Sequence, residues 1–189
     1  MDVRKARAGE EGKISRAIAD SFAKIFATFT KDMGRMAKVF ENGVAIERFC
    51  VAEQDGELIG IVACGCRAGR VLKSTKEECV ANLGAVRGRI AFRVIRSELM
   101  RPHEYPANVG YIDVLGVLPQ ARGKGVAKEL LNAVVQNFPQ YTEFILDVDS
   151  ANAPAIKSYT DFGFVEYKRV NTLPFINRGK IFMRYTTIS

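Results

Sequence analysis

The spacing of hydrophobic and polar positions in the first third of the chain predicts a strand, two helices and a hairpin. In the predicted helices, apolar residues recur every three to four positions. Asp55 and Gly56 form a dipeptide typical of a tight turn between two apolar runs, which predicts the hairpin. The expected elements are strands at 3–6, 48–52 and 58–63 and helices at 9–22 and 31–40.

The same pattern continues after residue 108. The run 144–148 is short and mostly apolar, which is typical of a buried strand. Gly163 follows a helical pattern and predicts its end. The chain contains no internal repeat and no linker, so a single domain over 1–189 is expected. The expected elements are strands at 109–117, 144–148, 164–170 and 181–185 and helices at 126–137 and 152–162.

Residues 67–104 interrupt this alternation and predict a helical insertion. Within them, apolar residues line one helical face and arginines line another. An arginine stripe of this kind either lies in solvent or binds a ligand that carries a carboxylate or phosphate. The apolar set is Leu83, Val86, Ile90 and Val94, and the basic set is Arg89, Arg93 and Arg96.

Composition narrows the class of protein. The chain has 189 residues, of which 48% are apolar and 26% charged, as in ordinary globular proteins. We expect a cytoplasmic location, because the N-terminus lacks the apolar core of a secretory signal and no apolar run is long enough to span a membrane. Nine of the basic and four of the acidic residues lie in 67–104, out of a net charge of +7. This excess suits an anionic ligand or solubility, and no nucleic-acid-binding motif accompanies it.

Metal binding is not expected. Cys64 and Cys66 form a C-x-C pair within a predicted strand, but no second closely spaced Cys/His pair exists to complete a zinc site. Buried reduced thiols are the better interpretation. His103 lies between Pro102 and Glu104 and is expected to be solvated in a loop.

A glycine-rich turn after the strand at 109–117 is the strongest candidate site. Gly123 and Gly125 precede a helix start, where backbone N–H groups lack partners and the helix dipole is positive. Such a turn can hold a pyrophosphate with backbone amides alone. Asp113 lies on the preceding strand, so a carboxylate is expected near this anion site.

Two motifs make nearly the whole chain resemble the Gcn5-related N-acetyltransferase (GNAT) family. The first is Gln/Arg-x-x-Gly-x-Gly/Ala, and the second is Asn-x-x-Ala-x-x-x-Tyr-x-x-x-Gly-Phe; they follow each other in the family's order. The matching residues are Arg122, Gly125 and Ala127 in the first and Asn152, Ala155, Tyr159, Gly163 and Phe164 in the second.

The resemblance implies an α/β fold and a cofactor. We expect a single GNAT domain with a mixed, mostly antiparallel sheet of about seven strands flanked by helices. The sheet should be splayed between strands 4 and 5, with the insertion between strands 3 and 4. Gly116 is expected to carry the bulge that opens the slot. The implied cofactor is acetyl-CoA, and its expected binding residues are Leu115, Val117, Arg122, Gly123, Lys124, Gly125, Val126, Ala127 and Asn152.

The resemblance also implies a reaction mechanism. An amine attacks the thioester, an oxyanion develops and coenzyme A leaves as a thiolate. Tyr159 matches the family's general acid, and the alternative is a core tyrosine. Asp113 is the candidate base or proton relay, although its ordinary pKa suits an ammonium poorly; a ligand for the substrate's ammonium or a structural carboxylate are the alternatives. Glu104 and Tyr111 are further candidates. Lys124 and Lys157 either approach the nucleotide phosphates or lie in solvent.

The acceptor implied is a primary amine of a small molecule or peptide, used in a ternary complex. The insertion at 67–104 borders the acceptor cleft in this fold and is expected to act as a lid. Two other functions stay open: a non-catalytic acyl-CoA sensor and a partner-binding module on the same fold. Neither nucleic acid nor membrane is expected as a partner. A homodimer is an alternative, because the C-terminal strands often pair two protomers in this family.

Overall fold

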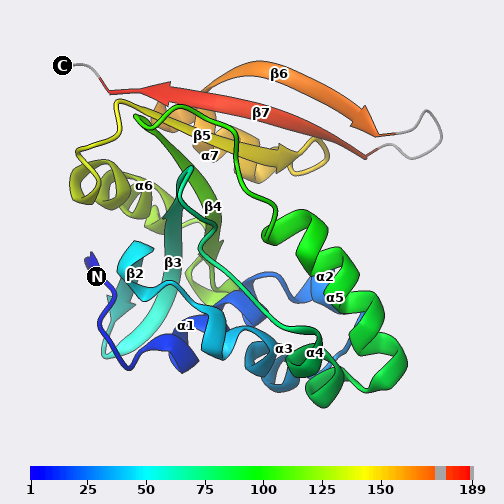
Figure 1. The fold of residues 1–189 in the computed structure, drawn as a ribbon. Helices are drawn as coiled ribbons and strands as arrows, with labels where there is room; N and C mark the ends of the chain where they lie inside the picture. Colours follow the sequence, from blue (N-terminus) through cyan, green and yellow to red (C-terminus); the bar gives the residue numbers. More distant parts are fainter. Residues whose placement is uncertain (173–177, 188–189) are drawn as a thin grey trace.

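One mixed sheet with helices on both faces organises the chain (Figure 1). The computed structural model describes residues 1–172 and 178–187, and in these residues the sheet has seven strands in the order β1-β2-β3-β4-β5-β7-β6. All neighbouring strands are antiparallel except β4 and β5. The expected fold class is confirmed. The strands are β1 (Asp2–Lys5), β2 (Phe49–Gln54), β3 (Glu57–Gly65), β4 (Val109–Val117), β5 (Glu143–Asp149), β6 (Val165–Thr172) and β7 (Arg178–Thr186).

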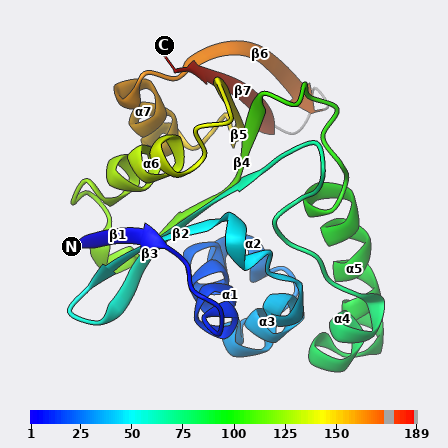
Figure 2. The same ribbon diagram turned by 60° about the vertical axis from the view of Figure 1, so that its left-hand side comes forward.

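The helices divide between the two faces of the sheet (Figure 2). α6 and α7 cover one face, and the first five helices lie on the other. The short helix α2 directly follows α1 and was not among the expected elements. No helix in the described ranges is long and apolar enough to cross a bilayer. The helices are α1 (Glu11–Ser21), α2 (Ala23–Phe26), α3 (Met33–Phe40), α4 (Lys76–Leu83), α5 (Ala85–Leu99), α6 (Val126–Asn137) and α7 (Ala153–Phe162).

Two hydrophobic cores result from strand alternation. On β2, Cys50 and Ala52 face the core beneath α6 and α7, whereas Phe49 and Val51 face the core beneath α1 and α3. Both sets are fully buried, so the central strands read as continuous apolar runs. The sheet is therefore a layer between two packed faces, and β4 carries the irregularities that concern the site, in its pairing with β3 and where it meets β5.

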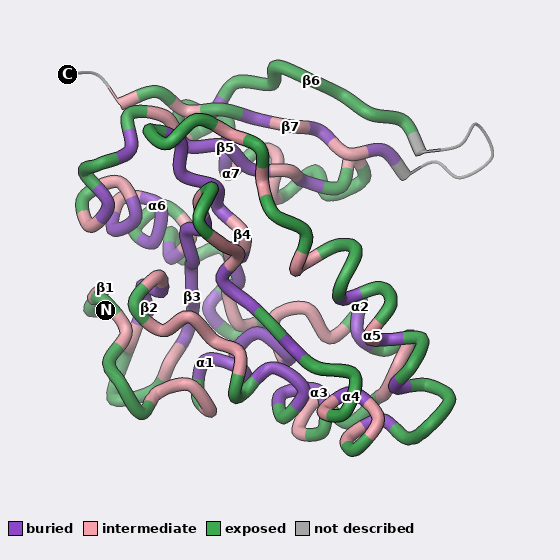
Figure 3. The backbone as a smooth tube through the Cα atoms, in the orientation of Figure 1, coloured by how far each residue is buried: buried purple, intermediate pink, exposed green. Residues whose placement is uncertain are grey.

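The insertion is helical, as expected, but it forms two helices, and the predicted apolar face of the second is wrong. Gly84, with φ of 86°, separates α4 from α5. Val86, Ile90 and Val94 are exposed by 73%, 54% and 42%. Figure 3 shows exposed and buried segments alternating along α5. The buried face of α5 instead carries Gly88, Ala91 and Ile95.

Close packing explains this choice of face. A Cβ on Gly88 would lie only 2.4 Å from the carbonyl oxygen of Cys79, so α5 contacts α4 through its smallest residue. Ala91 and Ile95 continue that contact into the core shared with α1 and α3. The larger β-branched residues cannot approach a neighbouring backbone as closely and remain in solvent.

Candidate active site

The site begins where β4 and β5 separate. The two strands pair over only three positions, ending at Tyr111 and Ile145. Beyond them β4 continues along β3 alone, so its other edge has no strand partner. A register shift in the β3–β4 pairing makes Asp113 an extra residue. Ile112 and Val114 therefore pack into opposite cores although they lie two positions apart. The expected splay is confirmed.

The bulge is not at Gly116, which corrects the expectation for that residue. Gly116 pairs in register with Ile61. A Cβ at Gly116 would lie 2.8 Å from both Cβ and Oγ of Ser21. The glycine therefore allows the last turn of α1 to approach β4 closely, and the strand irregularity arises three residues earlier.

Two amides on the open edge of β4 are available to a ligand. The Leu118 N–H donates to the carbonyl of Ile59 at 2.9 Å, which turns this amide toward β3. Because alternate amides of a strand point to opposite edges, those of Leu115 and Val117 turn toward the opening. Both residues were expected to bind the cofactor, and their placement on the unpaired edge agrees with that prediction.

The glycine-rich turn directly follows this edge. Gly123 and Gly125 have φ of 74° and 80°, a conformation that other residues rarely adopt, and Gly125 is the N-cap of α6. Within the described chain, the amides of residues 123–127 have no hydrogen-bond acceptor. Arg122 fixes the turn, since its guanidinium donates to the carbonyls of Val117 at 3.0 Å and Ser21 at 3.2 Å.

The surroundings of the turn are basic. A cavity of about 560 Å³ opens beside it, and its lining includes Lys124, Gly125 and Lys128 together with one carboxylate, Glu129. The partial positive charge at the start of α6 adds to these ammonium groups. Of the two alternatives for Lys157, the structure agrees with a position in solvent, where it forms an exposed ion pair with Asp161 at 2.7 Å on its own helix. Lys124 thus lies at the turn, and Lys157 is held elsewhere.

The second motif forms the start and the body of α7. The Asn152 side chain accepts from the amide of Ala155 at 3.3 Å, so it caps the helix as the sequence predicts. Tyr159 is buried, and its ring packs edge-on against Phe164. Burial and the negative charge of Asp147 raise the pKa of the Tyr159 phenol to about 12. The hydroxyl is therefore protonated at neutral pH.

Asp113 lies in a buried ion-pair cluster on the bulge. Its carboxylate lies 2.5 Å from Nε of Arg70 and 3.1 Å from Nε2 of His103, and it accepts from the amide of Val71. The Asp113 side chain is only 2% exposed. This carboxylate thus joins both ends of the insertion to β4.

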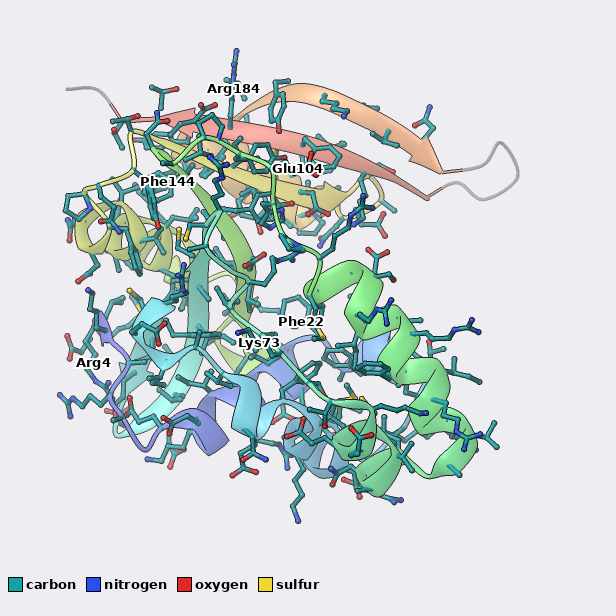
Figure 4. The ribbon with its side chains drawn as sticks, viewed as in Figure 1. Arg4, Phe22, Lys73, Glu104, Phe144 and Arg184 are labelled. Atoms are coloured by element: carbon teal, nitrogen blue, oxygen red, sulfur yellow. The ribbon has the colours of Figure 1, made fainter. Side chains whose placement is uncertain are left out.

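The expectation that His103 is solvated is wrong. Its side chain is 13% exposed and its ring stacks on Tyr111 with centroids 3.7 Å apart. The neighbouring prolines and charged residues resemble a solvated loop, but the buried Asp113 attracts the imidazole across ten positions of sequence. Glu104, labelled in Figure 4 on the segment that leads to β4, is exposed.

Sequence reasoning missed a second carboxylate at the opening. The Tyr111 hydroxyl donates to Asp147 on β5, and burial together with Asp147 raises the pKa of Tyr111 above its ordinary value. Lys180 of β7 lies 3.2 Å from Asp147 and 3.0 Å from Glu98 of α5. The only signal in the sequence is one acidic position within the apolar run 144–148.

Comparisons with known proteins agree with this geometry. A model of the acetyltransferase (GNAT) family matches residues 18–164. The chain belongs to this family. A relative of this GNAT chain, N-alpha-acetyltransferase 30 of Saccharomyces cerevisiae, is 31% identical over 85 residues, 44% of this chain and 48% of the relative. The match thus spans about half the length of that curated protein.

Solved GNAT structures share the fold across almost the whole chain. An N-acetyltransferase from Staphylococcus aureus Mu50 superposes with a TM-score of 0.64 at 14% identity, covering 98% of this chain and all of the other. A protein from Salmonella typhimurium, solved with its cofactor acetyl-CoA, gives a TM-score of 0.59 at 15% identity, covering 98% and 92%. At these identities the likeness shows the fold alone.

Acetyl-CoA is the cofactor of the family, and the residues present fit it. The unpartnered amides at 123–127 suit the pyrophosphate, since a helix start with glycines lets phosphate oxygens approach the backbone. The unpaired edge of β4 suits the amides of the pantetheine arm, which can bind like an added strand. A Cβ at Gly123 or Gly125 would meet no other atom within 4 Å, so the space above the turn is open.

Proposed function

We propose that this GNAT chain is an N-acetyltransferase that transfers the acetyl group of acetyl-CoA directly to a primary amine in a ternary complex. The observation that carries the proposal is the unpaired edge of β4 followed directly along the chain by the unpartnered amides of the glycine-rich turn. When bound, acetyl-CoA supplies the activated thioester. A sensor of acyl-CoA would need the same features, so turnover is the deciding measurement.

Different residues of the chain would bind the cofactor and take part in the reaction. The amides of residues 123–127 hold the pyrophosphate, and Arg122 keeps the turn in place. The amides of Leu115 and Val117 bind the pantetheine arm or donate to the carbonyl oxygen as negative charge develops there. Tyr159 donates a proton to the leaving sulfur, because its raised pKa keeps the phenol protonated. The proton that the attacking amine loses passes to solvent water.

Asp113 is better suited to a positioning role than to proton transfer. It already binds Arg70 and His103, and its side chain is almost fully enclosed. A carboxylate already occupied by three partners has little room to contact a substrate amine. These contacts favour the structural alternative among the three that the sequence left open.

The acceptor is a primary amine of a small molecule or a peptide. The yeast relative's name specifies an α-amine, which makes peptide N-termini the first acceptors to test. The insertion borders this side of the opening through Glu98 and His103, in keeping with its proposed role as a lid.

A panel assay of coenzyme A release tests the function. The purified chain and its Tyr159→Phe variant are incubated with acetyl-CoA and a library of peptides, amino amides and polyamines. We expect turnover on at least one class, with kcat lowered about 100-fold in the variant. Acetyl-CoA affinity, measured by calorimetry, should be equal in both and thus reports that the variant is folded. Tight binding without turnover on any amine would instead indicate an acyl-CoA sensor.

A further inference from the structure

Asp147 is a carboxylate at the opening that a substrate can reach. It lies on β5 two positions beyond Ile145, the last β5 residue that pairs with β4. Leu146 and Val148 are buried in the core beneath α6 and α7, so strand alternation turns Asp147 to the opposite face. Its side chain is 26% exposed, compared with 2% for Asp113.

Two carboxylates from distant segments converge on one ammonium group beside this position. Lys180 Nζ lies 3.2 Å from Oδ2 of Asp147 and 3.0 Å from Oε2 of Glu98. Tyr111 donates to the other oxygen of Asp147 and so orients the carboxylate. The arrangement is that of a binding site for a primary ammonium, with Lys180 as its occupant in the free protein.

Lys180 is an occupant that can leave. Its side chain is 45% exposed, and a lysine ammonium on a flexible four-carbon stem exchanges partly exposed ion pairs, here those with Asp147 and Glu98, for solvent at modest cost. Burial lowers the pKa of this ammonium, but Asp147 and Glu98 outweigh that effect and raise it. The two carboxylates therefore favour a cation at this point.

Asp147 is also coupled electrostatically to the proposed acid. The charge of Asp147 contributes to the raised pKa of Tyr159, which is carried by α7 on the other face of the sheet. An amine held by Asp147 would thus approach the open edge of β4 from the face opposite Tyr159. Direct transfer needs the amine beside the carbonyl carbon and an acid beside the leaving sulfur, and this placement lets both groups be present at once.

We propose that Asp147 and Glu98 form the subsite that binds the ammonium group of the acceptor, and that Lys180 leaves it when the acceptor enters. The inference rests on the proposed N-acetyltransferase function. It also selects a substrate class: amines without an anionic group next to the nitrogen, such as peptide N-termini and amino amides. A free amino acid would bring its carboxylate against two others of the same charge.

Steady-state kinetics with alaninamide as acceptor test the subsite. Asp147→Asn keeps an oxygen that accepts from Tyr111 but removes the charge, and we expect KM for the amine to rise about tenfold. Lys180→Met should lower KM several-fold by removing the competing ammonium. Glu166→Gln, at an exposed ion pair with Arg169, is the matched control and should change neither. An unchanged KM in Asp147→Asn, or a raised one in Lys180→Met, would overturn the proposal.

A binding measurement without acetyl-CoA separates this proposal from the proposed function. NMR titration should show that the chain prefers alaninamide to the uncharged lactamide, and that Asp147→Asn loses this preference. If that preference is present while no amine is ever acetylated, the subsite stands and the catalytic function fails. If amines are acetylated but the preference is absent or independent of Asp147, the subsite fails and the function stands.

Discussion

Asp113 and Asp147 lie on neighbouring strands of the same opening and differ in what surrounds them. Asp113 occupies the bulge, where Arg70 and His103 enclose it, and Asp147 lies on an unpaired strand edge with solvent beside it. The first suits a structural role and the second a contact with substrate. Their positions on the strands do not distinguish the two roles. The difference lies in how far each carboxylate is buried by its neighbours.

Removing the Asp113 charge should cost stability. Asp113→Asn leaves Arg70 and His103 without their shared carboxylate, and the expected loss in free energy of unfolding is about 3 kcal/mol. Asp161→Asn, which breaks the exposed pair with Lys157, should cost less than about 0.5 kcal/mol. Urea unfolding of both variants measures the difference. Equal losses would show that the Asp113 cluster contributes no more than a surface ion pair.

The raised pKa of the Tyr159 phenol predicts how kcat depends on pH. Its pKa is raised to about 12, so the protonated, proton-donating form persists at all lower pH values and is lost only as pH rises through that value. At saturating acceptor, kcat should therefore show no loss of an essential acid below about pH 10. A kinetic profile from pH 6 to 10 checks this. A decline below pH 10 that disappears in Tyr159→Phe would contradict it.

At the level of elements, α5 shows that a helix can bury its smaller residues and expose its larger ones. Gly88 and Ala91 lie against α4 and the first helices, and the stripe of Val86, Ile90 and Val94 faces solvent. The helix is therefore held by close backbone approach, which a hydrophobicity pattern does not register.

Two substitutions on α5 separate its faces. Ile95→Ala removes a side chain that is 2% exposed and should cost about 3 kcal/mol in free energy of unfolding. Ile90→Lys replaces a residue that is 54% exposed and should change stability by less than about 0.5 kcal/mol. Thermal or urea unfolding compares the two. A larger loss for Ile90→Lys would mean that the exposed stripe is covered in solution.

The sequence predicted the elements well and parts of the site poorly, for a physical reason. Strands, helices and the caps at Asn152 and Gly163 follow from local periodicity and local hydrogen bonds. The bulge at Asp113 and the burial of His103 depend on partners far along the chain. The Asp147–Lys180 pair likewise joins strands whose register only the folded sheet defines. Local patterns carry no information about such pairings.

For the whole molecule, the insertion is connected to the sheet at several points around the opening. The Arg70 guanidinium donates to the Arg101 carbonyl, joining the two ends of the insertion. His103 binds Asp113 on β4, and Glu98 binds Lys180 on β7. The insertion therefore borders the site as a part of the folded domain.

On the cofactor side, Arg122 connects the glycine-rich turn to β4 and α1. Arg122→Met removes both side-chain bonds that hold the glycine-rich turn, to Val117 and to Ser21, and we expect the Kd for acetyl-CoA to rise about fivefold because the amides are less well preorganised. Lys157→Met removes a cation that is paired on its own helix and should leave the Kd unchanged. Calorimetric titration compares them; equal affinities would rule out this role of Arg122.

The bond from Arg122 to the Ser21 carbonyl has a thermodynamic consequence. It joins the turn proposed to hold the pyrophosphate to the end of α1, which packs against β4 on the face where the acceptor would bind. If acetyl-CoA tightens that contact and so favours the acceptor by some factor, linkage requires the acceptor to favour acetyl-CoA by the same factor. Each substrate would then raise the affinity of the protein for the other, and the Arg122 guanidinium would determine by what factor.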